Sequence, residues 1–170
     1  MIEYHPGMTS PDRDLPAACT RLAEYLQSHK DQVISEWIAN VRWDPSVPSE
    51  ALTRPELTDH LPNIFDAIVK AIRDACTDAG DDDQVQHLAA RHTIVRWVQN
   101  YDLKAVLSEL SLLRAGLIHH LSAFEEHAPD FGTEARRFTS TIIHRVLDEI
   151  VMDATQTYFG LKAQSGENGV

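Results

Sequence analysis

Residues 103–124, LKAVLSELSLLRAGLIHHLSAF, decide the fold class of this chain. Apolar side chains recur there every three or four positions, the spacing that places them along one face of an α-helix. The residues with this spacing are Leu103, Val106, Leu107, Leu110, Leu113, Leu117, Leu121 and Phe124. The stripe continues for about six turns. It therefore predicts a long amphipathic helix that ends before Pro129.

The same helical spacing fills most of the remaining sequence, and no segment of useful length alternates apolar and polar residues as a half-buried strand does. The other expected helices span 14–26, 31–41, 53–80, 83–99 and 133–163. The first two can form one kinked helix, and Pro62 can kink or restart the third. Thr53 and Glu56 predict a capping box, and Asp102 predicts an N-cap. We expect an all-α bundle of five to six helices, with a globin-like arrangement as one option and a long C-terminal helix.

Length and charge limit the classes of protein that this sequence can represent. The 170 residues suit one compact domain, expected at 15–163, with a flexible N-terminus at 1–14 and a flexible tail or linker at 164–170. The formal net charge is −11. Such a charge repels phosphate backbones and anionic lipid. We therefore expect neither a nucleic-acid partner nor a membrane partner.

The cysteines and the hydropathy pattern bear on the compartment. The chain has two cysteines, Cys19 and Cys76, which lie far apart in helical apolar patterns. Buried thiols in a reducing compartment explain them, with a redox pair as the alternative. No apolar run approaches the 18 or so residues of a spanning helix, and the first residues do not resemble a signal peptide. The sequence thus predicts a cytoplasmic protein.

Sequence motifs for catalysis and metal binding are missing. The chain has neither the Gly-x-Ser-x-Gly elbow of hydrolases nor the glycine loop that holds phosphates, so we expect no enzyme. Glu-x-x-His and His-Glu-x-x-His are also absent, so we expect no metal site. Haem needs only one inward histidine, which His92 or His144 could supply. We expect no cofactor, with a haem-binding, globin-like sensor as the alternative.

Polar residues interrupt two helices that are otherwise apolar. His92 and Arg96 lie one turn apart on one predicted helix, whereas Glu109 and Arg114 lie on the next. A turn near Tyr101 can bring the two helices face to face. Buried charges must pair, because an unpaired buried charge costs several kcal/mol. This cluster is expected to be either a structural ion network or a pocket that senses a ligand.

At this cluster the sequence resembles the RsbRD-type N-terminal domain family, found ahead of sensor histidine kinases and in stressosome co-antagonist proteins. The family pattern is matched by His92, Arg96, Tyr101, Glu109, Leu113 and Arg114, and upstream by Trp37 and the pair Leu61-Pro62. The resemblance covers about residues 15–160. Thr93 and Leu110 depart from it, since a glycine and an aromatic residue are common there. The resemblance implies a helical input domain whose last helix passes a signal to a kinase or similar output module.

The last predicted helix carries a heptad stripe. Its members are Ile143, Leu147, Ile150, Ala154, Thr157 and Leu161. The stripe can pack inside one bundle or against the same helix of a second chain. Phe138, Ile142 and Val146 form a neighbouring stripe that can serve the bundle, so we favour a parallel homodimer. The sequence therefore predicts a non-catalytic, dimeric sensory domain of a bacterial signalling protein, with an output domain or signalling protein as partner and a small molecule as a further option.

Overall fold

The computed structural model describes residues 15–75 and 84–167, and within these ranges the regular structure is entirely helical. The helices are α1 Leu15–Ser28, α2 Lys30–Trp43, α3 Arg54–Thr58, α4 Leu61–Asp74, α5 Gln84–Val98, α6 Leu103–His127 and α7 Thr133–Glu167, with a short 3₁₀ turn at Ser49–Ala51. The predicted all-α class with a long C-terminal helix is confirmed. Apart from the five-residue α3, the described helices number six, each of 14 residues or more.

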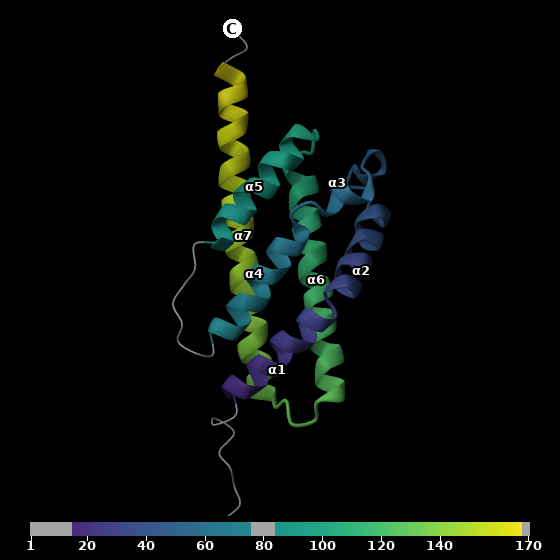
Figure 1. The fold of residues 1–170 in the computed structure, drawn as a ribbon. Helices are drawn as coiled ribbons and strands as arrows, with labels where there is room; N and C mark the ends of the chain where they lie inside the picture. The colour runs from purple at the N-terminus through teal and green to yellow at the C-terminus, as the bar shows by residue number, and fades with distance from the viewer. Residues whose placement is uncertain (1–14, 76–83, 168–170) are drawn as a thin grey trace, which may run out of the picture.

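The two longest helices form the frame of the bundle (Figure 1). α6 and α7 run in opposite directions beside each other, and α5 packs along α7. α1 packs on α4, and α2 packs on α6. The last turns of α7 extend past the other helices (Figure 1). The bundle therefore holds the first part of α7 in its core and leaves the end of that helix projecting.

Local sequence signals explain most helix ends. Thr53 and Glu56 form the predicted capping box at the start of α3. Asp102 caps α6 by accepting a hydrogen bond from the Ala105 amide at 2.8 Å. Pro62 restarts the helix rather than kinking it, because a proline at the start of α4 needs no amide donor. Proline thus divides the expected helix at 53–80 into α3 and α4.

One boundary differs clearly from the expectation, and several fall outside the described residues. α1 and α2 are the two separate helices expected at 14–26 and 31–41, and they meet at His29, whereas α7 continues past the expected end at Ala163 to Glu167. The expected flexible segment at 1–14, the helix end near Gly80 and the last three residues of the expected tail lie outside the described residues. The expectation of free thiols is wrong for Cys19, which forms a disulfide. The other cysteine of the sequence, Cys76, lies outside the described residues.

The structure places the heptad stripe of the terminal helix inside the bundle. Ile143, Leu147, Ile150 and Ala154 are fully buried against helices of the same chain, and Thr157 and Leu161 are half-buried. The neighbouring stripe is buried too at Ile142 and Val146. Both stripes are buried inside the bundle because α7 contacts four helices of the same chain, α1, α4, α5 and α6. The assignment of the first stripe to a contact with a second chain is therefore wrong for these four positions.

None of the helices in the described part of the chain combines the length and the apolar composition needed to cross a membrane.

Candidate functional site

The turn between α5 and α6 positions the polar cluster. Asn100 has a φ of 61°, in the left-handed region that asparagine tolerates better than most residues. The Tyr101 amide donates to the Arg96 carbonyl at 2.9 Å, and the Asn100 amide donates to the Trp97 carbonyl at 3.0 Å. These two bonds form a Schellman motif that ends α5. Because the motif ties Tyr101 back to Arg96, it fixes both side chains in the space between the two helices.

Arg96 is the centre of the cluster and is 2% exposed. Its Nε donates to Glu109 Oε2 at 2.7 Å, joining α5 to α6. Its Nη2 donates to the Leu57 carbonyl at 2.6 Å, and its Nη1 donates to the Glu56 carbonyl at 3.1 Å. Nη1 also donates to Gln99 Oε1 at 2.8 Å. One guanidinium therefore connects α3, α5 and α6.

Glu109 is the buried partner of that guanidinium. The His92 Nε2 atom lies 3.1 Å from the same Oε2 atom of Glu109, without forming a hydrogen bond to it. The Trp37 indole donates to the backbone carbonyl of Glu109 at 2.9 Å, which adds α2 to the network. The second carboxylate oxygen, Oε1, has no hydrogen-bond partner. Pairing with Arg96 is what makes burial of this carboxylate tolerable.

Tyr101 closes the cluster on one side. Its ring lies under the guanidinium of Arg96, with 5.2 Å between Cζ and the ring centroid. Burial raises the pKa of the Tyr101 hydroxyl, and the negative charge of Glu109 raises it further, so the hydroxyl stays protonated. A side-chain hydrogen bond with Glu109 raises the pKa of this hydroxyl as well. Two polar atoms of the network, His92 Nε2 and Glu109 Oε1, remain able to form another bond.

Comparison with known proteins identifies the family of the chain. A sequence model described as the RsbT co-antagonist protein rsbRD N-terminal domain matches residues 31–165. The chain belongs to this family. The description names a co-antagonist protein, so the family is one of regulatory domains. No curated protein and no solved structure matches the chain.

In this rsbRD N-terminal domain the structure brings together four of the five residues predicted for the polar cluster. They are His92, Arg96, Tyr101 and Glu109, all buried. Arg114 is instead directed toward α7, where its Nη2 donates to Asp148 Oδ1 at 2.5 Å. The reason is helix geometry, since a residue five positions after Glu109 faces a different side of α6.

The two histidines considered for haem have different surroundings. His92 is buried in the network, whereas His144 is exposed on α7. Among the described residues, no group of three or more histidine, cysteine or acidic side chains is arranged to hold a metal ion.

Sequence reasoning missed several members of the network. The carbonyls of Glu56 and Leu57 accept from Arg96, but a backbone acceptor leaves no signal in a sequence. Gln99 also escaped notice, although its position three residues after Arg96 places it on the same face of α5. Trp37 was not assigned to the network, although the indole nitrogen of a buried tryptophan needs a hydrogen-bond partner.

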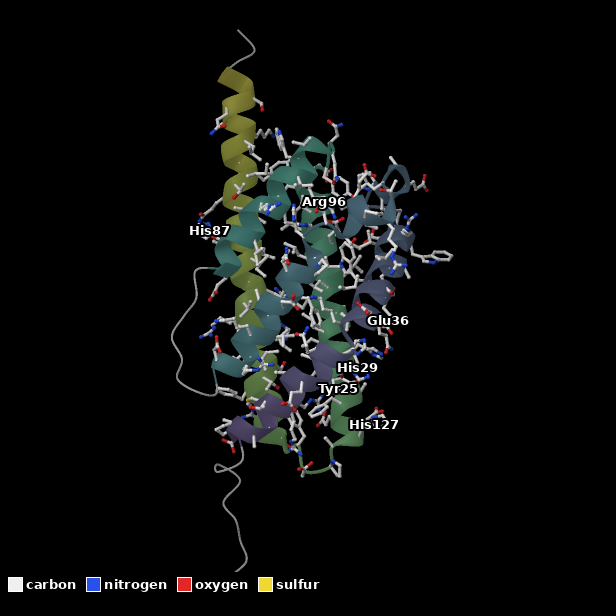
Figure 2. The ribbon with its side chains drawn as sticks, viewed as in Figure 1. Tyr25, His29, Glu36, His87, Arg96 and His127 are labelled. Carbon is white, nitrogen blue, oxygen red and sulfur yellow. The ribbon has the colours of Figure 1, made fainter. Side chains whose placement is uncertain are left out.

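A second histidine–glutamate pair lies elsewhere in the domain. His120 on α6 is buried, and its Nε2 lies 2.8 Å from Glu36 Oε2 on α2. Hydrogen bonds from Gln32 and His120 lower the pKa of the Glu36 carboxyl. Figure 2 shows Glu36 near Tyr25 and His29 at the junction of α1 and α2, apart from Arg96. This pair provides a comparison for the Arg96 network, because Glu36 is partly exposed whereas Glu109 is buried.

Proposed function

We propose that this chain is a non-catalytic sensory domain that receives a signal at the Arg96 network and transmits it through α7. The network comprises His92, Arg96, Tyr101 and Glu109. The output is a histidine kinase or a similar signalling module, and two copies of the domain work together. Membership of a regulatory family supports this proposal.

The observation that carries the proposal is the set of bonds made by Arg96. This residue joins α3, α5 and α6, and α5 packs along α7. A change in the bonds of the guanidinium can therefore be passed to α7 through α5 alone. Because the close-packed interior resists continuous deformation, such a change favours a shift between discrete arrangements.

The network offers two ways for a signal to act. A small polar ligand can bond to His92 Nε2 and Glu109 Oε1, and so compete for Glu109 with Arg96. Alternatively, a protein partner can displace α3, whose last carbonyls accept from Arg96. In either case the signal can shift the equilibrium between two arrangements of the domain only by the difference between its binding free energies for them.

Hydrogen exchange of α5 and α7 tests this proposal. Glu109→Gln removes the negative charge that Arg96 faces while keeping the size of the side chain. We expect faster exchange in α5 and in the last turns of α7, because the contact that holds α5 to α6 is weaker. Mass spectrometry of peptides from the wild type and the variant measures this difference.

Glu36→Gln is the matched control, since it makes the same change in the other histidine–glutamate pair. We expect its effect to remain near α2 and α6. Equal exchange of α7 in the wild type and in Glu109→Gln would contradict the proposal, as would an identical response to both substitutions. Absorbance of the purified protein in the visible region would instead favour the haem alternative.

A further inference from the structure

Two buried histidines lie close to Arg96. His60, the N-cap residue of α4, is 4% exposed, and His92 on α5 is 3% exposed. His60 Nε2 lies 3.0 Å from Asp59 Oδ2. His92 Nε2 lies 3.1 Å from Glu109 Oε2, and neither Nε2 atom forms a hydrogen bond. Because the charge of a histidine ordinarily changes between about pH 5 and pH 8, each imidazole has a carboxylate within reach that can accept a hydrogen bond once the ring is protonated.

Charged and titratable groups from several elements surround the two histidines. They are Asp59 in the turn between α3 and α4, Arg91 and Arg96 on α5, Tyr101 in the turn between α5 and α6, and Glu109 on α6. α4 and α7 also pack on α5, but the side chains that they bury are apolar apart from one threonine. Burial lowers the pKa of His60, an effect that Asp59 opposes and that the positive charges on α5 reinforce. Protonation of either histidine therefore places a second positive charge close to Arg96.

His92 and Arg96 address the same atom of Glu109. Arg96 Nε donates to Glu109 Oε2 at 2.7 Å, and His92 Nε2 lies beside that same oxygen. While His92 is neutral, the buried carboxylate is balanced by one buried cation. A protonated His92 adds a second cation beside a single carboxylate, and an unbalanced charge is costly in the protein interior. One of the two cations must then leave Glu109.

The surroundings of the two cations indicate which one leaves. Arg96 Nη1 donates to Gln99, which is half-buried, and to the backbone carbonyl of Glu56, an exposed residue. The guanidinium therefore lies at the edge of the network nearest to solvent, and a long side chain can turn its charged end toward water. His92 Nε2 is completely enclosed. Arg96 is thus the cation that leaves, and its bonds to the carbonyls of α3 are lost with it.

We propose that protonation of His92 displaces Arg96 from Glu109, so that the Arg96 network responds to acidification. This inference rests on the proposed function and names the proton as the signal that acts at the same network. In the acidic arrangement both ring nitrogens of His92 carry a proton, and Nε2 donates to Glu109. His60 acts in the same direction, because its protonation adds positive charge near Arg96. The acidic arrangement binds the proton more tightly, so falling pH favours it by up to about tenfold per pH unit.

Nuclear magnetic resonance of the whole chain tests the inference by following two side chains in one titration. The Nε–H signal of Arg96 reports its bond to Glu109, and the carbon-bound ring hydrogens of His92 report protonation. We expect both to change with the same midpoint between about pH 8 and pH 5, while the backbone amide signals of α6 show that the domain stays folded. An Arg96 signal that stays constant while His92 titrates would overturn the proposal. So would a His92 that does not titrate before the signals of α6 are lost, because the domain then unfolds instead.

His92→Gln identifies the group that binds the proton, because glutamine does not titrate and can still donate to Glu109. We expect the midpoint of the Arg96 signal to fall by at least about one pH unit in this variant. An unchanged midpoint would overturn the assignment, since the proton then acts on another group such as Glu109. His120→Gln is the matched control, because His120 is also buried beside a glutamate, Glu36, which lies apart from Arg96 (Figure 2). We expect its Arg96 signal to titrate as in the wild type, and a shift equal to that of His92→Gln would count against the proposal.

Hydrogen exchange separates this inference from the proposed function. If the Arg96 signal follows His92 but Glu109→Gln leaves the exchange of α7 unchanged, the response to protons is supported and transmission to α7 fails. If Glu109→Gln alters the exchange of α7 but the Arg96 signal does not follow His92, transmission stands and the proton is overturned as its signal.

Discussion

Replacing Arg96 with methionine tests how strongly the network holds the domain together. Methionine fills much of the same volume but cannot donate a hydrogen bond. The substitution removes four bonds, to Glu109, Gln99 and the carbonyls of Glu56 and Leu57. It also leaves the Glu109 carboxylate buried without its cation.

The magnitude follows from burial. Arg96 is almost completely buried, as is Glu109, so solvent cannot replace the lost partner. Removing one member of a buried ion pair typically costs about 3–5 kcal/mol. We expect Arg96→Met to lower the free energy of unfolding by about that amount, which is a large share of the stability of an ordinary domain.

Urea denaturation followed by circular dichroism measures this cost, and a second variant identifies its origin. Adding Glu109→Leu to Arg96→Met removes the unpaired carboxylate. The double variant should therefore be more stable than Arg96→Met alone, by at least about 1 kcal/mol. A cost below about 1 kcal/mol for Arg96→Met, or a double variant that is less stable still, would refute the reasoning.

Three further predictions concern other contacts. Trp37→Phe should lower the free energy of unfolding by about 1–2 kcal/mol, because the indole no longer donates to the Glu109 carbonyl; an unchanged urea midpoint would count against that bond. Leu147→Asp should unfold the domain by burying a carboxylate in the core, whereas circular dichroism showing a folded monomer would mean that Leu147 faces a partner instead. Burial lowers the pKa of His60 from its ordinary 6.5, an effect that Asp59 opposes, so the unfolded chain binds a proton more readily. Stability should then decline as the pH falls below about 6.5, and urea titrations of His60→Asn should show a shallower decline.

Periodicity predicted the helices because each buries an apolar stripe, and a stripe is visible in the sequence. The capping side chains of Thr53 and Asp102 predicted where α3 and α6 begin, since an N-cap depends on one side chain and a nearby amide. The four residues by which α7 extends past its expected end at Ala163 could not be predicted in the same way. Its polar last turns carry no stripe, and the helix continues through them from a well-packed start.

The sequence predicted the part of the candidate site that depends on pairing of charged side chains. It did not predict the part that depends on which helices pack together. His92, Arg96 and Glu109 were expected to meet because buried charges need partners. The expected role of the Ile143 stripe failed for a physical reason. A heptad spacing shows that a helix has a buried seam, but it does not show which chain covers the seam. Here α7 is covered by four helices of its own chain.

The central claim is that the Arg96 network controls the position of α7. Spin labels at Trp43 and Lys162, both exposed, can report the distance between the end of α2 and the projecting part of α7. Labels carried by genetically encoded amino acids leave the cysteines unchanged, and dilution with unlabelled chain isolates distances within one copy. The account predicts that Glu109→Gln shifts or broadens the distance distribution measured by pulsed electron paramagnetic resonance, whereas Glu36→Gln leaves it unchanged. Superimposable distributions for the wild type and Glu109→Gln would contradict it.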